Sequence, residues 1–179
     1  MAFTFKHELL GPWLAEHAPG DRLVSYITTT TKGIGYSGPA PGSTTSRSTG
    51  SPERCDQARS DLADSLGLDE ERSVGRGYLD VFHVLTDRQL VIGSISSFRQ
   101  RPKDVLHAAP LEEVRVHWFD CDSGAGTHFR HFVTVLGDGS WRSDKTGVKA
   151  MGKVLKAASR VDEFVAALGD RAIEEDVGY

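Results

Sequence analysis

The chain has 179 residues, enough for one domain with a buried core. Its formal net charge of −4 and pI near 6.0 argue against a dedicated nucleic-acid binder, because such domains are usually strongly basic. No apolar run approaches the roughly 20 residues that a membrane-spanning helix needs, and Met1 to Lys6 lack the pattern of a signal peptide.

The first twenty residues predict a helical extension. Residues 5–17 place Leu9, Leu10, Trp13 and Leu14 on one helical face, and the run His17-Ala18-Pro19-Gly20 ends it. We expect this helix to pack on the domain, with a docking helix that presents Trp13 as the alternative. The domain itself spans 21–168 and begins with a strand over Leu23–Thr29.

An insertion over 30–76 follows this strand. Residues 30–50 are dominated by Thr, Ser, Gly and Pro, which favours a flexible loop, and their glycines match no phosphate-binding motif. The alternative is that this Ser/Thr tract is phosphorylated or becomes ordered on a partner. Ser51, Pro52 and Glu53 are typical of a helix start, and Gly67 is a natural stop for this acidic helix.

The stretch from Tyr78 to Lys145 predicts consecutive antiparallel strands. Residues 79–86 alternate between two faces, Thr86–Gln89 forms a turn, and Leu90–Ile92 opens the return strand. Asp138-Gly139 is the strongest short hairpin motif. The further strands are expected over Asp104–Ala109, Val114–Phe119, His128–Leu136 and Ser140–Asp144.

The carboxy-terminal part predicts a helix that closes the sheet. Its apolar stripe runs from Val148 to Leu168, Ser159 can cap a second helical segment, and Gly169 is a natural end. No acidic residue occurs between 145 and 160, so we expect one cationic helix face. That face comprises Lys145, Lys149, Lys153, Lys156 and Arg160. Residues 169–179 form an acidic tail that we expect to be frayed.

This order of elements resembles the bacterial pleckstrin-homology-like (PH-like, GRAM-like) domains of actinobacterial type, whose function is unknown. Residues 84–92 (VLTDRQLVI) are similar to their LTDRRLLV hairpin, and residues 101–114 resemble their RPK…IPLDDI stretch. Asp138-Gly139 and residues 162–168 (DEFVAAL) resemble their DG…ERFVEAL ending. The resemblance implies an α+β, mainly β fold. In that fold a bent barrel of about seven antiparallel strands is closed by a C-terminal helix, with an N-terminal helix and a loop–helix insertion after the first strand.

The same resemblance implies a binding or scaffolding module. Lipid-binding PH domains carry a basic cluster in the loop after their first strand, where this chain offers Lys32 and Arg47 followed by an acidic helix. Phosphoinositide recognition by that route is therefore not expected.

The sequence contains no motif of a catalytic or metal site. HExxH, CxxC and GxSxG motifs are absent, and strand parity sends His128 and His131 to opposite faces. A Cys121 nucleophile would need a base such as His117, and nothing orients that pair. The two cysteines, Cys55 and Cys121, are too few and too far apart for a disulfide framework, which favours a reducing cytoplasm.

We therefore expect a cytoplasmic, non-catalytic interaction module that binds a protein partner or its own copies. No cofactor, metal, nucleic acid or transmembrane segment is expected. The alternative function is peripheral binding to anionic lipid or phosphate groups through the basic helix face. A small-ligand or enzyme role in the barrel mouth is a third hypothesis. The candidate binding residues are Arg99, Arg101, Lys103, Lys145, Lys149, Lys153, Lys156 and Arg160.

Overall fold

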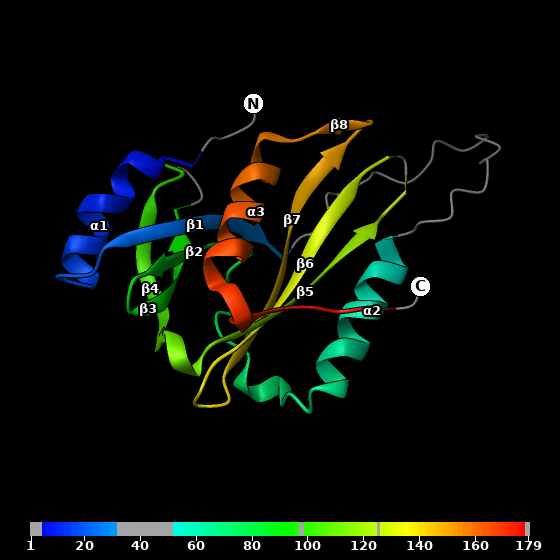
Figure 1. The fold of residues 1–179 in the computed structure, drawn as a ribbon, viewed down its shortest axis with the longest axis horizontal. Coiled ribbons are helices and arrows are strands. Elements are labelled where there is room, and N and C mark those ends of the chain that lie inside the picture. Colours follow the sequence, from blue (N-terminus) through cyan, green and yellow to red (C-terminus); the bar gives the residue numbers. More distant parts are fainter. Residues whose placement is uncertain (1–4, 32–51, 97–98, 125, 178–179) are drawn as a thin grey trace.

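The computed structural model describes residues 5–31, 52–96, 99–124 and 126–177, and shows one extended sheet with three α-helices packed on it (Figure 1). The helices are α1 (Leu10–His17), α2 (Pro52–Ser65) and α3 (Lys156–Leu168), with short 3-10 turns η1 (His7–Leu9), η2 (Glu70–Arg72), η3 (Leu111–Glu113) and η4 (Gly169–Arg171). The strands are β1 (Leu23–Thr30), β2 (Asp80–Thr86), β3 (Gln89–Ile95), β4 (Pro102–Pro110), β5 (Arg115–Asp122), β6 (His128–Val135), β7 (Trp141–Ala150), β8 (Lys153–Val154) and β9 (Ala172–Glu174).

The sheet is open, so the expected closed barrel is wrong. Its strand order is β4-β3-β2-β1-β7-β6-β5-β9, with β8 paired to the end of β7. All pairs are antiparallel except the parallel pair of β5 and β9. The two halves join through a single residue pair, Thr30 with Lys145. Helix α3 packs mainly against β1 and β7, on either side of this narrow junction. The mainly β composition and a C-terminal helix after the strands are confirmed.

Alternation along the strands divides the buried side chains between two faces. On β2, Val81 and Leu85 join the main core under α3, whereas Phe82 and Val84 pack with α1. On β6, Phe132 belongs to the main core, whereas its neighbour Val133 lies under α2. One face of the sheet is thus covered by α3, and the other is covered by α1 on the first half and by α2 on the second (Figure 1).

Several boundaries follow the sequence prediction. The amino-terminal helix is present as η1 and α1, and the hairpin of β2 and β3 turns at the expected residues. Trp13 is buried, meets the Phe82 ring edge-on and donates its indole N–H to the Lys103 carbonyl oxygen at 2.6 Å. The helix is therefore packed on the domain, and the alternative of a docking helix that presents Trp13 is wrong. Most of the 30–50 loop lies outside the described residues.

The carboxy-terminal prediction is wrong in its first half. Residues 141–150 continue the sheet as β7, and α3 begins only at Lys156, so Ser159 lies inside the helix and does not cap it. Gly169 does end the helix, at φ +59°. The described part of the tail, up to residue 177, is attached to the sheet and not frayed, because β9 pairs with β5 and Glu175 donates its backbone N–H to the Trp118 carbonyl oxygen. Within the described residues, no helix is both long and apolar enough to cross a membrane.

Candidate functional site

The first predicted basic group lies where the chain enters β4. Arg99 and Arg101 are exposed, and Lys103 is the second residue of the strand. The Lys103 ammonium is 2.9 Å from the Asp104 carboxylate, whose hydrogen bond and charge raise the pKa of Lys103. An exposed pair of this kind contributes little to stability. These three residues therefore remain a small exposed cationic segment beside the sheet edge.

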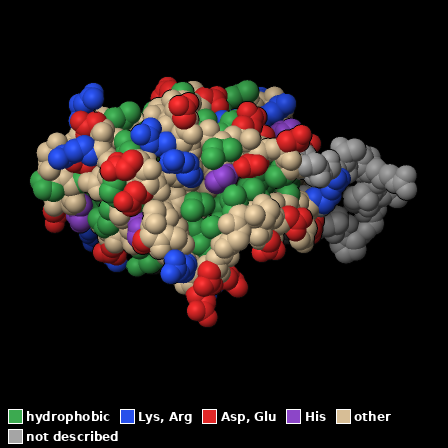
Figure 2. Space-filling view, turned by 60° about the horizontal axis from the view of Figure 1, so that its bottom comes forward, with side chains coloured by type: hydrophobic (Ala, Val, Ile, Leu, Met, Phe, Trp, Pro, Cys, Tyr) green, Lys and Arg blue, Asp and Glu red, His purple; other side chains and the backbone are tan. Residues whose placement is uncertain are grey.

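The second predicted group does not lie on one helix face. Lys145 and Lys149 lie on β7, Lys153 lies on β8, and only Lys156 and Arg160 belong to α3. Lys145 is buried, and the Arg160 guanidinium stacks on the Tyr26 ring at 4.4 Å. On the face shown in Figure 2, basic side chains lie singly among acidic ones. The structure therefore leaves only Lys149, Lys153 and Lys156 as neighbours around the β7–β8 hairpin.

The β7–β8 hairpin exposes apolar side chains at its tip. Ala150 pairs with Lys153, and the two residues between them, Met151 and Gly152, both have positive φ, at +49° and +75°. This is the backbone of a type I′ turn, in which a non-glycine residue at positive φ is strained. Met151 is 88% exposed and Val154 is 76% exposed. No other large hydrophobic residue of the described chain is more than half exposed.

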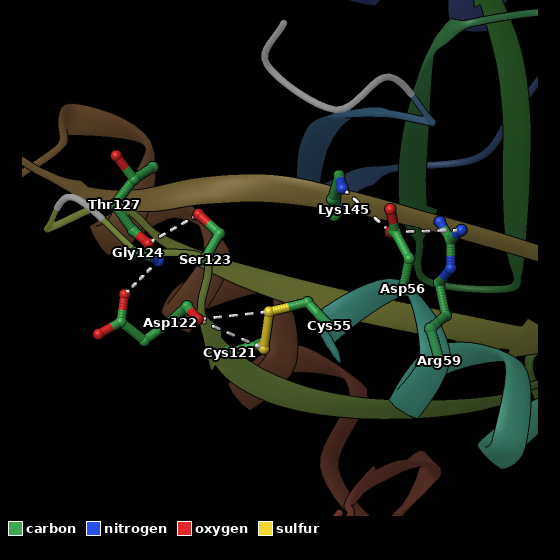
Figure 3. The surroundings of a disulfide bond; sticks show 9 residues. All are labelled: Cys55, Asp56, Arg59, Cys121, Asp122, Ser123, Gly124, Thr127 and Lys145. Atoms are coloured by element: carbon green, nitrogen blue, oxygen red, sulfur yellow. Dashed lines mark hydrogen bonds and ion pairs between the residues drawn. A yellow bond between two sulfur atoms is a disulfide. The ribbon is translucent and has the colours of Figure 1, made fainter. Parts of the chain in front are cut away.

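A disulfide joins α2 to β5 (Figure 3). Cys55 and Cys121 are bonded, with Cα atoms 5.9 Å apart, and both residues are buried. The expectation that these cysteines stay unpaired is wrong, and the argument it gave for a reducing compartment fails with it. The turn after β5 is ordered beside the bond, because Asp122 accepts the Gly124 backbone N–H at 2.8 Å and the Ser123 hydroxyl donates to the Thr127 carbonyl oxygen at 3.0 Å.

Charged groups lie next to this disulfide. The Asp56 carboxylate of α2 accepts from the Lys145 ammonium at 3.2 Å and lies 3.5 Å from the Arg59 guanidinium (Figure 3). The Lys145 ammonium also lies 5.3 Å from the centre of the Phe129 ring. A lysine that is 3% exposed needs such partners, because an unpaired buried charge is costly.

His131 lies under α2 with an unusual environment. Its ring stacks on Phe119 at 4.9 Å, the residue is fully buried, and neither ring nitrogen has a hydrogen-bond partner in the described structure. Burial and the positive charges of Lys145 and Arg59 together lower the pKa of His131 to about 3, although the negative charges of Asp56 and Asp120 oppose the shift. His131 is therefore neutral at ordinary pH, so its burial under α2 does not require a charged group to be removed from water.

A second buried ionic group lies on the opposite face of the sheet. The Asp144 carboxylate is 2.7 Å from Arg142 Nε and 3.1 Å from His83 Nε2. Burial alone would raise the pKa of Asp144, but the charge and hydrogen bonds of His83 and Arg142 together lower it. Arg142 also donates to the carbonyl oxygens of Val74, Gly75 and Tyr78 at 3.0 to 3.1 Å. The group fastens the segment before β2 to β7, and its carboxylate is closed to solvent.

Sequence reasoning missed the disulfide, the burial of His131 and this ionic group. One usable pattern was present: Arg142 and Asp144 share a strand face with core positions, and charges there predict a buried ion pair. The cysteines are 66 residues apart and give no comparable local pattern.

Metal ligands are not gathered in the described residues, since no three His, Cys, Asp or Glu side chains lie in a ligating group. His128 and His131 do point to opposite faces, as their parity requires. A hollow of about 420 Å³ lies beside β1 and β7, and its lining includes Thr28, Thr30, Asp80 and Lys145. Comparison of the chain with protein-family models, with curated proteins and with solved structures gives no match.

Proposed function

We propose that this protein is a non-catalytic interaction module that binds an extended segment of a protein partner, or a second copy, along the outer edge of β4. The observation that carries the proposal is the open sheet, in which β4 has, among the described residues, a paired strand on one side only. An unpaired edge offers backbone N–H and C=O groups to an incoming strand.

Part of the β4 edge is already occupied. Helix α1 and the preceding residues use its beginning, through the Trp13 bond to the Lys103 carbonyl oxygen and the Lys6 N–H bond to the Gln100 carbonyl oxygen at 2.8 Å. The stretch from Val105 to Ala109 has no outer strand within the described residues, and Val105 is 37% exposed. Pro102 and Pro110 bound the strand and limit the length of added pairing.

The opposite edge is a poorer docking site. Strand β9 has three residues, and the chain from Glu174 to Asp176 is acidic. Short edges with charged side chains discourage strand addition. The asymmetry therefore favours β4 as the binding edge. The resemblance to PH-like domains, a bacterial source and a cytoplasmic location all stay predictions.

Size-exclusion chromatography with light scattering, over a range of protein concentrations and at low and high salt, tests whether the protein binds a second copy of itself. A charged gatekeeper at the edge, Val105→Lys, should abolish any wild-type dimer. The matched control Val24→Lys also charges a partly exposed strand valine, but β2 and β3 separate β1 from the β4 edge, so the dimer should persist. A dimer that survives Val105→Lys contradicts the β4 edge.

If the wild type is a monomer throughout, the partner is another protein. A photo-crosslinking residue at position 105 should then capture one partner that the same residue at position 24 does not. Equal capture from both positions would count against the edge.

A second function is favoured by the β7–β8 hairpin: peripheral binding to an anionic lipid surface. Its exposed Met151 and Val154 are flanked by Lys149, Lys153 and Lys156. Apolar side chains that enter the headgroup region, with lysines that contact anionic lipids, are the two components of interfacial binding. Each lysine near such a surface contributes about 1 kcal/mol.

The variant Met151→Asn tests the insertion of the hairpin tip into a lipid surface without disturbing the fold of the hairpin. Asn-Gly is the preferred pair for a type I′ turn, so the hairpin should be retained and strengthened while its apolar tip is lost. Sedimentation with vesicles that contain 30% phosphatidylserine should show wild-type binding that weakens in high salt and a clear loss in Met151→Asn. Binding that is unchanged in this variant, or absent in the wild type at low salt, removes the lipid hypothesis.

A further inference from the structure

Helix α2 is attached firmly at its carboxy-terminal end. The residues that follow it are fixed to β7, because the Trp141 indole N–H donates to the Asp69 carbonyl oxygen at 2.6 Å and the Val74 N–H donates to the Trp141 carbonyl oxygen at 2.7 Å. Gly67, at φ +66°, lies between the helix and these anchors, and nothing packs within 4 Å of its Cβ position. The chain therefore has a natural hinge at this end.

The amino-terminal end of α2 is attached to the sheet in a different way. Most of the helix is polar, and its buried side chains are Cys55, Leu62 and Ala63. Toward its start, the attachments of the helix to the sheet include the Cys55–Cys121 bond, the contact of Cys55 with the Asp122 carbonyl oxygen and the Asp56–Lys145 pair (Figure 3). Asp56 is about half exposed, so its ion pair is only partly shielded from water. The disulfide is the covalent clamp on this end.

The surface under α2 is built differently from an ordinary core. Apolar Phe119 and Val133 lie there together with neutral His131 and the ammonium of Lys145. Both ring nitrogens of His131 can take part in hydrogen bonds, and neither has a protein partner among the described residues. A buried imidazole without partners favours any state in which water reaches it. This surface therefore opposes the closed position of the helix that covers it.

We propose that α2 is a redox-controlled cover, in which the Cys55–Cys121 disulfide holds the helix shut over β5, β6 and β7, and reduction lets it swing outward about Gly67. The proposal is independent of the β4 edge and of the lipid hypothesis. Its reductant is a dithiol. One thiolate of the dithiol attacks a sulfur of the disulfide, forming a mixed disulfide and releasing the other cysteine as a thiolate that takes a proton.

The second thiol of the reductant then displaces the remaining cysteine. Two electrons and two protons have passed to Cys55 and Cys121, and the reductant leaves as its own disulfide. Because both cysteines are no more than 2% exposed, the reductant reaches them only when fluctuations of the closed protein expose the intact bond. The rate of reduction therefore reports how often the intact bond becomes exposed.

Opening should also take up a proton. In the closed state the pKa of His131 is about 3, and in the open state it returns toward 6.5. The charged groups that face His131 are Lys145 from β7, Arg59 and Asp56 from α2, and Asp120 from β5. Between pH 3 and 6.5 the open state binds more protons, so a fall in pH favours opening. From pH 7.5 to pH 5 the open fraction of the reduced protein should rise about 30-fold.

Hydrogen exchange on the full chain tests the cover. The protein is compared before and after treatment with a phosphine reductant, which acts at both pH values, and a mass gain of 2 Da confirms reduction. Protection factors are used because they correct for the intrinsic pH dependence of exchange. In the reduced protein the amides of residues 53–65 should lose protection at least about tenfold, while those of β2 and β3 stay unchanged.

Two variants complete the test. Cys121→Ala should show the reduced behaviour without any reductant. His131→Leu, once reduced, should open equally at pH 5 and pH 7.5, because the titrating group is gone.

Three outcomes overturn the cover: equal α2 protection in both redox states, a disulfide that resists reduction until the whole chain unfolds, or loss of β2 and β3 protection together with α2. Equal opening of the reduced wild type at both pH values overturns the proton coupling.

Discussion

Replacement of Arg142 by methionine should test the buried ionic group most directly. Methionine keeps much of the apolar length of the side chain and removes the guanidinium. The change leaves Asp144, which is fully buried, with the His83 ring as a remaining hydrogen-bond partner, and removes the donor from three carbonyl oxygens. Breaking one partner out of a buried pair typically costs 3–5 kcal/mol, so we predict a loss of about 4 kcal/mol.

Urea unfolding, followed by tryptophan fluorescence, measures this loss. It should appear as a lower midpoint with an unchanged slope, and it would remove a large part of the roughly 5–15 kcal/mol that stabilises a domain. The control is Arg22→Met, because Arg22 is 77% exposed and lies 3.7 Å from Asp87, so its loss should cost no more than about 1 kcal/mol. An Arg142→Met loss as small as that of the control would refute the argument.

Three further predictions concern packing, the disulfide and pH. Gly93→Ala should lower stability by about 1–3 kcal/mol in thermal unfolding, because an added Cβ would lie 2.2 Å from the buried Phe82 ring; an unchanged melting temperature would show that the ring moves freely. Removing the disulfide, whose loop spans 66 residues, should cost about 4 kcal/mol in urea unfolding; a loss below about 1 kcal/mol would mean that the unfolded chain is hardly constrained by it. Stability should fall by about 2 kcal/mol from pH 7.5 to pH 5, because the pKa of His131 is lowered from 6.5 to about 3 and the unfolded chain binds more protons in that window; His131→Leu should remove this slope.

The sequence predicted the hairpin of β2 and β3 well because its evidence is local. Alternation along residues 79–86 and a four-residue turn specify both strands and their pairing without reference to the rest of the chain. The same holds for the turn at Asp138-Gly139, where Gly139 has φ +80°. The conformation of such segments is determined by their own residues, so it can be predicted from the local sequence.

The error at residues 145–155 has a physical origin. Val148, Met151 and Leu155 recur at helical spacing, yet Thr146 and Val148 are β-branched, and Met151-Gly152 fits a tight turn. Pairing with β6, from His128 to Val135, decides between the two conformations, and that contact is distant in the sequence. Closure of the sheet likewise depends on whether its two edge strands, β4 and β9, pair with each other, which no local pattern specifies. Because Lys145 and Lys149 lie on β7 and not on a helix, the expected cationic helix face does not form.

The Cys55–Cys121 disulfide and the exposed tip of the β7–β8 hairpin lie close enough together to influence one another. The turn between β5 and β6, which follows Cys121, approaches the tip of the hairpin: a Cβ placed on Gly126 would lie 3.7 Å from the Gly152 backbone nitrogen and 3.8 Å from Met151 Cα. A change at the disulfide therefore has a short route, through this turn, to the exposed Met151. If the route transmits the change, vesicle binding should differ between the oxidised and reduced protein, and Cys121→Ala should bind as the reduced protein does. Equal binding in all three would mean that the cover and the hairpin act separately.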